Sequence, residues 1–199
     1  MLFVENVEEI LKFGRDHHVP VLRDESTEFF LNKVKQISPK TILEIGTAIG
    51  YSGSLMLSAC PDSTLDTIEK NEQSYLIAKQ NFADLGFGDR AHLFLGDGLE
   101  VCKSLREMGK KYDLIFLDGP KGQYIYYLDV LLDMLTPCGV LLCDNFLFQG
   151  LVRSDVDVGH KKRAMITKLR RFLHEIETRQ DIITIVHENG DGIAEIRKK

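Results

Sequence analysis

The sequence lacks the features that mark several classes of protein. It has no run of about 20 apolar residues, the length that spans a bilayer, and the segment Met1–Lys12 carries three glutamates in place of an apolar leader. Its four cysteines show neither CxxC spacing nor clustered histidines, so we expect reduced core thiols and no zinc site. Secretion and membrane insertion are therefore not expected, and the predicted location is cytoplasmic.

The overall charge argues against a protein coated in basic side chains. The chain has 25 Lys and Arg residues against 30 Asp and Glu residues, a formal net charge of −5, so any surface for a polyanion must be local. With 199 residues, of which 44% are hydrophobic, it is long enough to bury the core of one domain. No internal repeat and no linker rich in Pro, Gly or Ser divides it. A single domain over residues 1–199 is predicted.

Short apolar runs rich in β-branched residues alternate with stretches of helical spacing. Strands are expected at Thr41–Ile45, Thr64–Glu69, Ala91–Leu95, Tyr112–Leu117 and Gly139–Cys143. The helices that follow the first four strands are expected at Tyr51–Cys60, Glu72–Leu85, Leu99–Gly109 and Gln123–Leu135, and two more at Val4–Arg15 and Asp24–Ile37 precede the first strand. This βαβ rhythm predicts a parallel sheet covered by helices on both faces.

The C-terminal part departs from this rhythm. A long helix at Lys161–Thr178 is followed by two apolar runs, Asp181–Val186 and Gly192–Arg197, whose connection, Glu188–Asp191, reads as a hairpin turn. The predicted fold is therefore α/β and doubly wound, with a Rossmann-like, mostly parallel seven-stranded sheet that ends in an antiparallel hairpin. Class I S-adenosylmethionine-dependent methyltransferases have this arrangement.

The first predicted strand runs into a glycine-bearing turn, Gly46–Gly50, where a ligand could approach bare backbone at the start of a helix. A nicotinamide-binding turn would read GxGxxG, but the second glycine position is Thr47. Glu69, at the end of the second strand, could accept hydrogen bonds from both hydroxyls of a ribose. Asp97 and Gly98, after the third strand, would border an adenine. This order of residues fits S-adenosylmethionine.

Oxygen-bearing side chains follow the fourth and fifth strands. Asp118 comes after one and the pair Asp144 and Asn145 after the other, and neighbouring strands lie about 4.8 Å apart. Mg²⁺ takes about six oxygen ligands, so these three, a water and two vicinal substrate oxygens would complete its shell. Taken alone, the pair reads as a turn. Enzymes that methylate amino groups of bases typically carry Pro-Pro next, whereas Phe146 and Leu147 follow here, which argues against that reaction.

With these motifs, the chain from about Val19 to Lys199 resembles the cation-dependent O-methyltransferases of the catechol and caffeoyl-CoA type. The resemblance implies that Gly46 and Ser52 line the methionine end of the cofactor and that Glu44 supports the loop. It also implies that Val21 contacts the cofactor from a segment, residues 1–38, that covers the active site of a core made by residues 39–199. Asp118 would serve both the cofactor and the metal, and relatives of this architecture are commonly homodimers.

Lys121 lies three residues beyond Asp118, the spacing at which the resembled family carries its catalytic lysine. A nearby divalent cation and sulfonium would destabilise its ammonium form, and the metal would acidify a bound hydroxyl, so both effects favour proton transfer to Lys121. It is the candidate base. The alternatives are a solvated surface lysine and a phosphate contact.

The resemblance leaves catechols, hydroxycinnamoyl thioesters and modified nucleosides open as substrates. The stretch Gly150–His174 has seven basic residues against two acidic ones, a net charge of +5. Apolar residues fall at helical spacing in the same stretch, at Met165, Leu169, Phe172, Leu173 and Ile176. This helix could therefore bury one stripe and offer a polyanion a path to the site. An ordinary solvated face remains the alternative.

Three segments, Lys121–Tyr124, Asp144–Phe148 and His160–Arg163, resemble the bacterial tRNA 5-hydroxyuridine methyltransferases. The 5-hydroxyl and 4-carbonyl of that base are vicinal oxygens, much as in a catechol. Either Tyr124 or Phe146 is expected to stack on the exposed wobble base, with core packing as the alternative. The expected contacts to the tRNA anticodon region are Arg153, Lys161, Lys162 and Arg163.

Three functions follow, in order of preference. The first is metal-dependent O-methylation of the wobble uridine of tRNA. The second is the same chemistry on a small catechol-like or hydroxycinnamoyl molecule. The third, a non-catalytic nucleotide-binding module, conflicts with the combined set of Asp118, Lys121, Asp144 and Asn145.

Overall fold

The computed structural model describes residues 5–22, 24–154, 159–188 and 190–199 of the chain. The strands are β1 (Thr41–Ile45), β2 (Thr64–Glu69), β3 (Ala91–Leu95), β4 (Tyr112–Leu117), β5 (Leu135–Cys143), β6 (Ile182–His187) and β7 (Ile193–Lys198). The helices are α1 (Val7–Asp16), α2 (Asp24–Ile37), α3 (Tyr51–Ala59), α4 (Glu72–Asp84), α5 (Gly98–Glu107), α6 (Tyr124–Met134), α7 (His160–Thr178) and the short 3-10 helix η1 (Lys121–Gln123).

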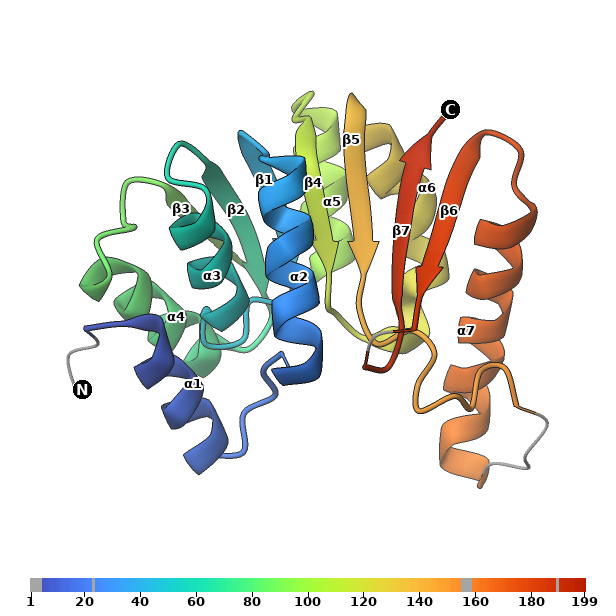
Figure 1. Cartoon of the computed structure of the whole chain (residues 1–199), viewed down its shortest axis with the longest axis horizontal. Coiled ribbons are helices and arrows are strands. Elements are labelled where there is room, and N and C mark those ends of the chain that lie inside the picture. Colours follow the sequence, from blue (N-terminus) through green and yellow to red (C-terminus); the bar gives the residue numbers. More distant parts are fainter. Residues whose placement is uncertain (1–4, 23, 155–158, 189) are drawn as a thin grey trace.

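One seven-stranded sheet forms the centre of the molecule, in the order β3-β2-β1-β4-β5-β7-β6 (Figure 1). Strands β1 to β5 are parallel, whereas β7 is antiparallel to both of its neighbours, β5 and β6. The predicted α/β fold, with its parallel core and C-terminal antiparallel pair, is confirmed. The chain order reverses between β1 and β4, and open α/β sheets bind their ligands at the carboxyl ends of the strands at such a point.

The main difference from the predicted elements is the start of β5. The strand begins at Leu135 and not at Gly139, because Leu135 pairs with Tyr112 before a register shift restores regular pairing from Leu114 onward. The intervening Thr-Pro-Cys-Gly sequence has the composition of a turn, which conceals this irregular strand from a sequence pattern. Helix α2 has the predicted bounds, and the ends of the other helices differ by at most three residues from those predicted; the side chain of Asn6 caps the observed start of α1.

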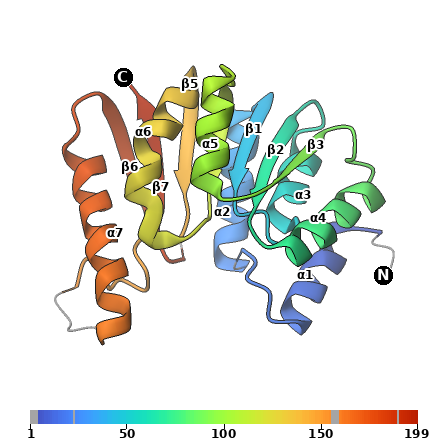
Figure 2. The same ribbon diagram turned by 180° about the vertical axis from the view of Figure 1, so that it is seen from behind.

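Two hydrophobic layers cover the sheet. Helices α2, α3 and α4 lie on the face seen in Figure 1, and α5, α6 and α7 lie on the face seen in Figure 2. On the first face, Phe30 of α2 packs against Phe116 of β4 with ring centroids 4.5 Å apart. Helix α2 therefore belongs to the core layer, while α1 packs against α3. The division of the chain into a covering segment and a core at residue 38 stays a prediction.

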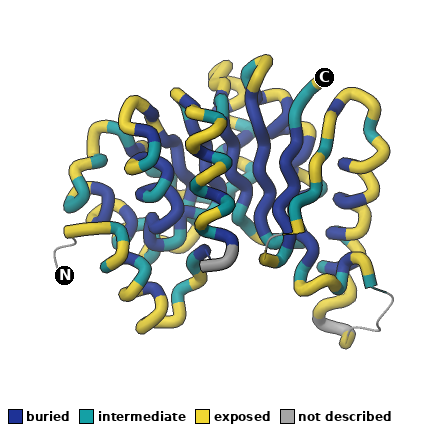
Figure 3. The backbone as a smooth tube through the Cα atoms, in the orientation of Figure 1, coloured by how far each residue is buried: buried dark blue, intermediate teal, exposed yellow. Residues whose placement is uncertain are grey.

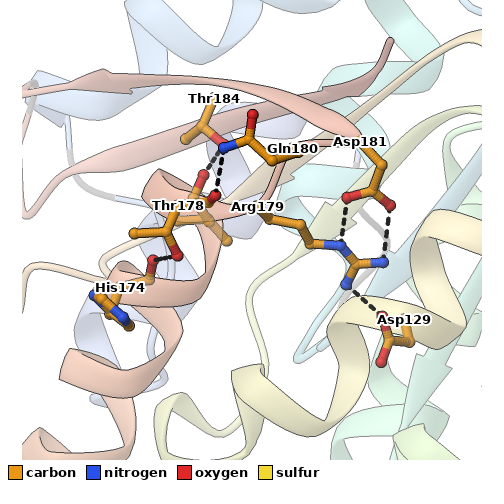
Figure 4. A network of polar contacts seen from close by, with 8 residues as sticks. Asp129, His174, Thr178, Arg179, Gln180, Asp181 and Thr184 are labelled. Atoms are coloured by element: carbon orange, nitrogen blue, oxygen red, sulfur yellow. Dashed lines mark hydrogen bonds and ion pairs between the residues drawn. The ribbon is translucent and has the colours of Figure 1, made fainter.

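The end of α7 is tied to its neighbours by a polar network (Figure 4). The guanidinium of Arg179 pairs with both carboxylate oxygens of Asp181, at 2.7 and 3.0 Å, and also reaches Asp129 of α6. The hydroxyl of Thr184 on β6 donates to the carbonyl of Ile176 at 2.6 Å. These contacts anchor one end of α7, and its other half packs against η1, which follows β4.

The edge strand β6 exposes apolar side chains. Ile183 and Ile185 are about half exposed, and the tube in Figure 3 shows exposed and intermediate positions along most of this strand. Among the described residues, no helix has the length and apolar character needed to span a membrane.

Candidate active site

The turn after β1 brings two strand ends into contact. Gly46 has φ of +103°, and a Cβ at this position would collide with the carbonyl oxygen of Asp118. Only glycine tolerates both the backbone conformation and the close approach. The amide of Gly46 donates to the carbonyl of Ile68 at 3.0 Å, and Gly50, with φ of +86°, starts α3. The predicted cofactor turn therefore lies directly against the end of β4.

A buried carboxylate supports this turn from below. Glu44 is fully buried and accepts hydrogen bonds from the hydroxyls of Ser52, at 2.5 Å, and Thr67, at 2.6 Å. Thr47 in turn lies 2.5 Å from Thr67, hydroxyl to hydroxyl. Burial raises the pKa of Glu44 to about 7, because removing the carboxylate from water outweighs the two hydrogen bonds. Glu44 thus has the supporting position that the resemblance implies.

Replacing Glu44 with Gln should flatten the pH dependence of stability. Because the pKa of Glu44 is raised on folding from 4.5 to about 7, its stabilising neutral form is fully present below pH 4.5 and is lost as the pH rises through about 7. Glutamine keeps the neutral state throughout. Urea unfolding at pH 8 should show the variant more stable than the natural chain, by on the order of 3 kcal/mol at most.

The control for that measurement is Glu107→Gln, since Glu107 is exposed at the end of α5. The advantage of Glu44→Gln should disappear toward pH 4.5, whereas the control should follow the natural chain at every pH. Parallel stability curves for Glu44→Gln and the natural chain would show that the carboxylate is ionised in both states.

A pocket opens at the carboxyl ends of β1, β2, β3 and β4. Its lining residues are Ile45, Gly46, Ile68, Glu69, Lys70, Gly96, Asp97, Gly98, Gly119, Pro120 and Tyr127. Glu69 is fixed at the rim by the amides of Ala48, at 2.8 Å, and Asn71, at 2.7 Å. Across the pocket, Asp97 caps α5 through the amide of Leu99. Four predicted cofactor residues therefore meet in one pocket, namely Gly46, Glu69, Asp97 and Gly98.

Two polar side chains of this pocket, those of Lys70 and Tyr127, were not among the predicted site residues. Lys70 follows Glu69 and bonds Asp97 at 3.1 Å, so it spans the rim from β2 to the start of α5. The hydrogen bond from Lys70 holds the pKa of Asp97 below its usual value. Tyr127 enters from α6, one helical turn after Tyr124, a spacing that could have indicated a shared face.

Three other predicted cofactor contacts, Val21, Ser52 and Asp118, do not line the pocket. Val21 is partly buried in the layer of α1 and α3, where it faces Gly14. Ser52 is buried, and its hydroxyl donates a hydrogen bond to Glu44. Contact of these residues with a cofactor stays a prediction.

Asp144 and Asn145, which follow β5, carry buried oxygens that no donor satisfies. Among the described residues, Asp144 Oδ1 and Asn145 Oδ1 are enclosed and have no hydrogen-bond partner. The other oxygen of Asp144 accepts from the Asn145 amide at 2.7 Å, and Asn145 adopts a left-handed backbone with φ of +54°. Burial, together with the neighbouring Asp118 carboxylate, raises the pKa of Asp144. The two oxygens therefore lack a donor within the described structure.

This arrangement fits a hard divalent cation. Buried oxygens of a carboxylate and an amide, with a second carboxylate nearby, are the donors that Mg²⁺ accepts. The described residues contain no cluster of three or more His, Cys, Asp or Glu, because the predicted third ligand is the Asn145 amide oxygen. Asp118, whose side chain is 27% exposed, is positioned on the solvent side of the group.

Lys121 of η1 contacts two of the three predicted metal ligands, Asp118 and Asp144. Its ammonium lies 2.6 Å from Asp118 Oδ1 and 3.1 Å from the carbonyl oxygen of Asp144, and it donates to the hydroxyl of Tyr124 at 2.9 Å. The side chain is 18% exposed. The sequence prediction that Asp118, Lys121 and Asp144 lie together is therefore confirmed by the geometry.

The predicted stacking of Tyr124 and Phe146 on a base is wrong. Both side chains are 0% exposed and pack at the edge of Phe172 of α7, with ring centroids 5.7 and 6.1 Å away. The hydroxyl of Tyr124 bonds the carbonyls of Leu117 and Asp144, each at 3.0 Å. Tyr124 therefore supports the strand ends from inside the core. No face of either ring is open to a nucleotide.

The basic region is only partly available to a polyanion. Arg153 lies 3.0 Å from Glu188 and 3.8 Å from Glu177, so two carboxylates lie beside its guanidinium, and its contact with RNA stays a prediction. Lys162 is exposed over the ring of Phe148, and Arg163 is exposed on α7. The side chain of Lys161 lies outside the described part of the structure.

Comparison with known proteins decides the family. The model of the O-methyltransferase family matches residues 5–199. This chain belongs to the O-methyltransferase family. A caffeoyl-CoA O-methyltransferase of Petroselinum crispum is 31% identical over 85% of the chain and 73% of its own length. A catechol O-methyltransferase of Niastella koreensis is 30% identical over 62% of the chain and 57% of its own length.

Among solved structures, the SAH-bound methyltransferase PaMTH1 of Podospora anserina is similar to this chain over nearly its whole length. It has a TM-score of 0.85 and 26% sequence identity, covering 97% of this chain and 87% of its own. In this O-methyltransferase the pocket adjoins the oxygen cluster formed by Asp118, Asp144 and Asn145, because Gly46 in the pocket lining lies against the carbonyl of Asp118.

Proposed function

We propose that this O-methyltransferase uses S-adenosylmethionine and a divalent cation such as Mg²⁺ to methylate a hydroxyl that has a second oxygen beside it. The observation that carries the proposal is the pair of buried, unpartnered oxygens on Asp144 and Asn145, next to the ammonium of Lys121. Oxygens in such a place need a cation or donors, and an acceptor with two adjacent oxygens can share that cation.

The cofactor would occupy the pocket between the strand ends. Glu69, held by two backbone amides, presents its carboxylate at the rim, where ribose hydroxyls can donate to it. Gly46 leaves room at the β1 turn for a ligand to approach the backbone, and Asp97 and Gly98 border the base. The sulfonium end would then point toward Asp118, since the β1 turn and that residue are in contact.

The metal would be held by Asp118, Asp144 and Asn145, and when bound it would acidify an acceptor hydroxyl and fix its direction. Lys121, in its neutral amine form, would take the hydroxyl proton at Nζ and become the ammonium. Three groups orient that atom, namely Asp118 Oδ1, the Tyr124 hydroxyl and the carbonyl of Asp144. With the acceptor oxygen and the methyl carbon aligned, the remaining barrier is lowered mainly by proximity.

A small catechol-like acceptor is the substrate that the structure and the relatives favour. Related proteins are named for caffeoyl-CoA and catechol, which both carry vicinal hydroxyls. The rings of Tyr124 and Phe146 are buried, so they offer no stacking surface that would favour a nucleic acid. The 5-hydroxyuridine of the tRNA wobble position is the second candidate, because Lys162, Lys168 and Arg171 lie on α7, whose first half packs against the η1 segment that carries Lys121.

A paired assay distinguishes the two candidates. With catechol as acceptor and S-adenosylmethionine as donor, we expect methylation that stops with EDTA and returns with Mg²⁺. Changing Lys162, Lys168 and Arg171 together to Glu should leave this rate within about twofold, since a small acceptor needs no phosphate contacts. Each lost phosphate contact would lower the salt slope of RNA binding by about 0.7 to 0.9.

The matched control changes three exposed lysines away from α7, namely Lys12, Lys35 and Lys79. If only the α7 variant loses methylation of tRNA that carries 5-hydroxyuridine, and the salt slope falls, RNA becomes the preferred acceptor. Full activity on every acceptor after all divalent metal has been removed would contradict the proposed function.

The expected homodimer also remains a proposal. Ile183 and Ile185 are half exposed on the edge strand β6, on a part of the sheet face that Figure 1 shows without a covering helix. We propose that a second copy of the chain contacts β6, because pairing along this edge strand would remove the exposed side chains of Ile183 and Ile185 from water.

A further inference from the structure

The hydroxyl of Tyr127 is a polar group without a partner inside the cofactor pocket. Tyr127 is 1% exposed and lines the pocket from α6. Among the described residues, no hydrogen bond involves its hydroxyl. The other two buried tyrosines of this face are satisfied, since Tyr112 donates to Asp66 at 2.6 Å, and the Tyr124 hydroxyl has two carbonyl oxygens within 3.0 Å to share its proton and accepts from Lys121. Tyr127 is the exception that faces the pocket.

The position of this hydroxyl is fixed by Gly98. A Cβ at residue 98 would collide with the Tyr127 hydroxyl, and the next nearest atom is a methyl group of Ile45. The oxygen is therefore seated against the backbone at the start of α5, on the side of the pocket made by β3 and α5. It does not belong to the set of fully enclosed, unpartnered atoms, so it reaches the pocket space.

The chemistry of this group suits a neutral ligand atom. Burial raises the pKa of Tyr127, so the hydroxyl stays protonated at physiological pH and can both donate and accept. A buried hydroxyl without a partner is costly, and the apolar side chains of Ile45 and Ile68 in the same lining offer it no hydrogen bond. A polar ligand atom in this place would satisfy it.

We propose that the hydroxyl of Tyr127 is a hydrogen-bond partner of the nucleobase of the bound cofactor and helps to select that base. The assignment rests on the proposed use of S-adenosylmethionine. The base and not the ribose is the partner, because Tyr127 abuts Gly98, which borders the base in the proposed placement of the cofactor, whereas the ribose is assigned to Glu69 on β2. Glycine at residue 98 would then serve two purposes: it leaves room for the Tyr127 hydroxyl, and it lets the base approach the backbone.

The test replaces Tyr127 with Phe, which removes one oxygen and keeps the ring. Isothermal titration with S-adenosylhomocysteine should show Kd about tenfold higher, the effect of one lost hydrogen bond in a buried site. The Tm of the ligand-free protein should be unchanged or slightly higher, because the deleted hydroxyl has no partner there. The rise in Tm on adding S-adenosylhomocysteine should be smaller than for the natural chain.

The control is Tyr126→Phe, since Tyr126 precedes it on α6, is 49% exposed and faces Lys168. This variant should bind S-adenosylhomocysteine as the natural chain does. A second ligand, S-inosylhomocysteine, tests the base itself: the natural chain should prefer the adenine ligand, and Tyr127→Phe should lose part of that preference.

Three results would overturn the inference. They are an unchanged Kd in Tyr127→Phe, an affinity loss matched by a lower Tm of the ligand-free protein, and an equal loss for both bases. Failure of the proposed cofactor is seen separately, because the natural chain itself would then bind no S-adenosylhomocysteine.

Discussion

Replacing Lys121 with Met is expected to lower kcat about a thousandfold while the Kd for S-adenosylhomocysteine changes less than about threefold. General-base catalysis is typically worth a factor of a hundred to ten thousand, and the ammonium lies at the oxygen cluster and not among the residues that line the cofactor pocket. Methionine keeps the apolar stem and removes only the charge and the proton acceptor. Initial rates with catechol at saturating cofactor, together with calorimetric titration, measure both quantities.

A matched variant guards against a general loss of stability. Lys79→Met removes a cation from the exposed face of α4 and should behave as the natural chain. The rate of Lys121→Met should also lose the rise with pH that proton transfer to a base gives. A kcat within threefold of the natural chain across neutral pH would remove Lys121 as the base and leave the metal as the activating group.

The sheet and its strand ends could be predicted because their signals are local. Five apolar runs, each followed by a helical stretch, fix a parallel sheet, and parallel strands place their carboxyl ends along one edge. That rule alone brings Gly46, Glu69, Asp97, Asp118 and Asp144 to one side of the molecule. The backbone brings these strand ends close together: at residue 46 only glycine fits, because a Cβ there would collide with the carbonyl oxygen of Asp118.

The parts that could not be predicted depend on side-chain direction and long-range partners. Tyr124 is buried and Tyr126 exposed although they are two residues apart, because opposite faces of α6 meet the core and the solvent. Phe146 follows Asn145, whose left-handed backbone turns the chain. The direction of the Phe146 side chain therefore cannot be predicted from residue spacing. Arg170 donates to the carbonyls of Val152 and Ser154, so one predicted surface cation instead holds a loop.

A trade-off between stability and function is expected at Asp144. Because burial and Asp118 raise the pKa of Asp144 on folding, its stabilising neutral form is present at low pH and is lost as the pH rises through that pKa. Asp144→Asn should therefore be more stable than the natural chain at pH 8 in EDTA. The same change should reduce turnover of catechol with Mg²⁺ by more than a thousandfold, since a ligand charge is lost.

The paired change at the next residue is Asn145→Gly. Glycine keeps the backbone at φ of +54° and removes only the amide, whereas alanine would add strain. Both variants should bind S-adenosylhomocysteine nearly as the natural chain does, and both should lose the rise in Tm that Mg²⁺ gives to the natural chain. If Mg²⁺ raised the Tm of Asp144→Asn and Asn145→Gly as much as that of the natural chain, the cation would lie elsewhere. The buried oxygens of these two residues would then need another explanation, because an unpaired carboxylate oxygen and an unpaired amide oxygen side by side destabilise any fold that leaves them unused.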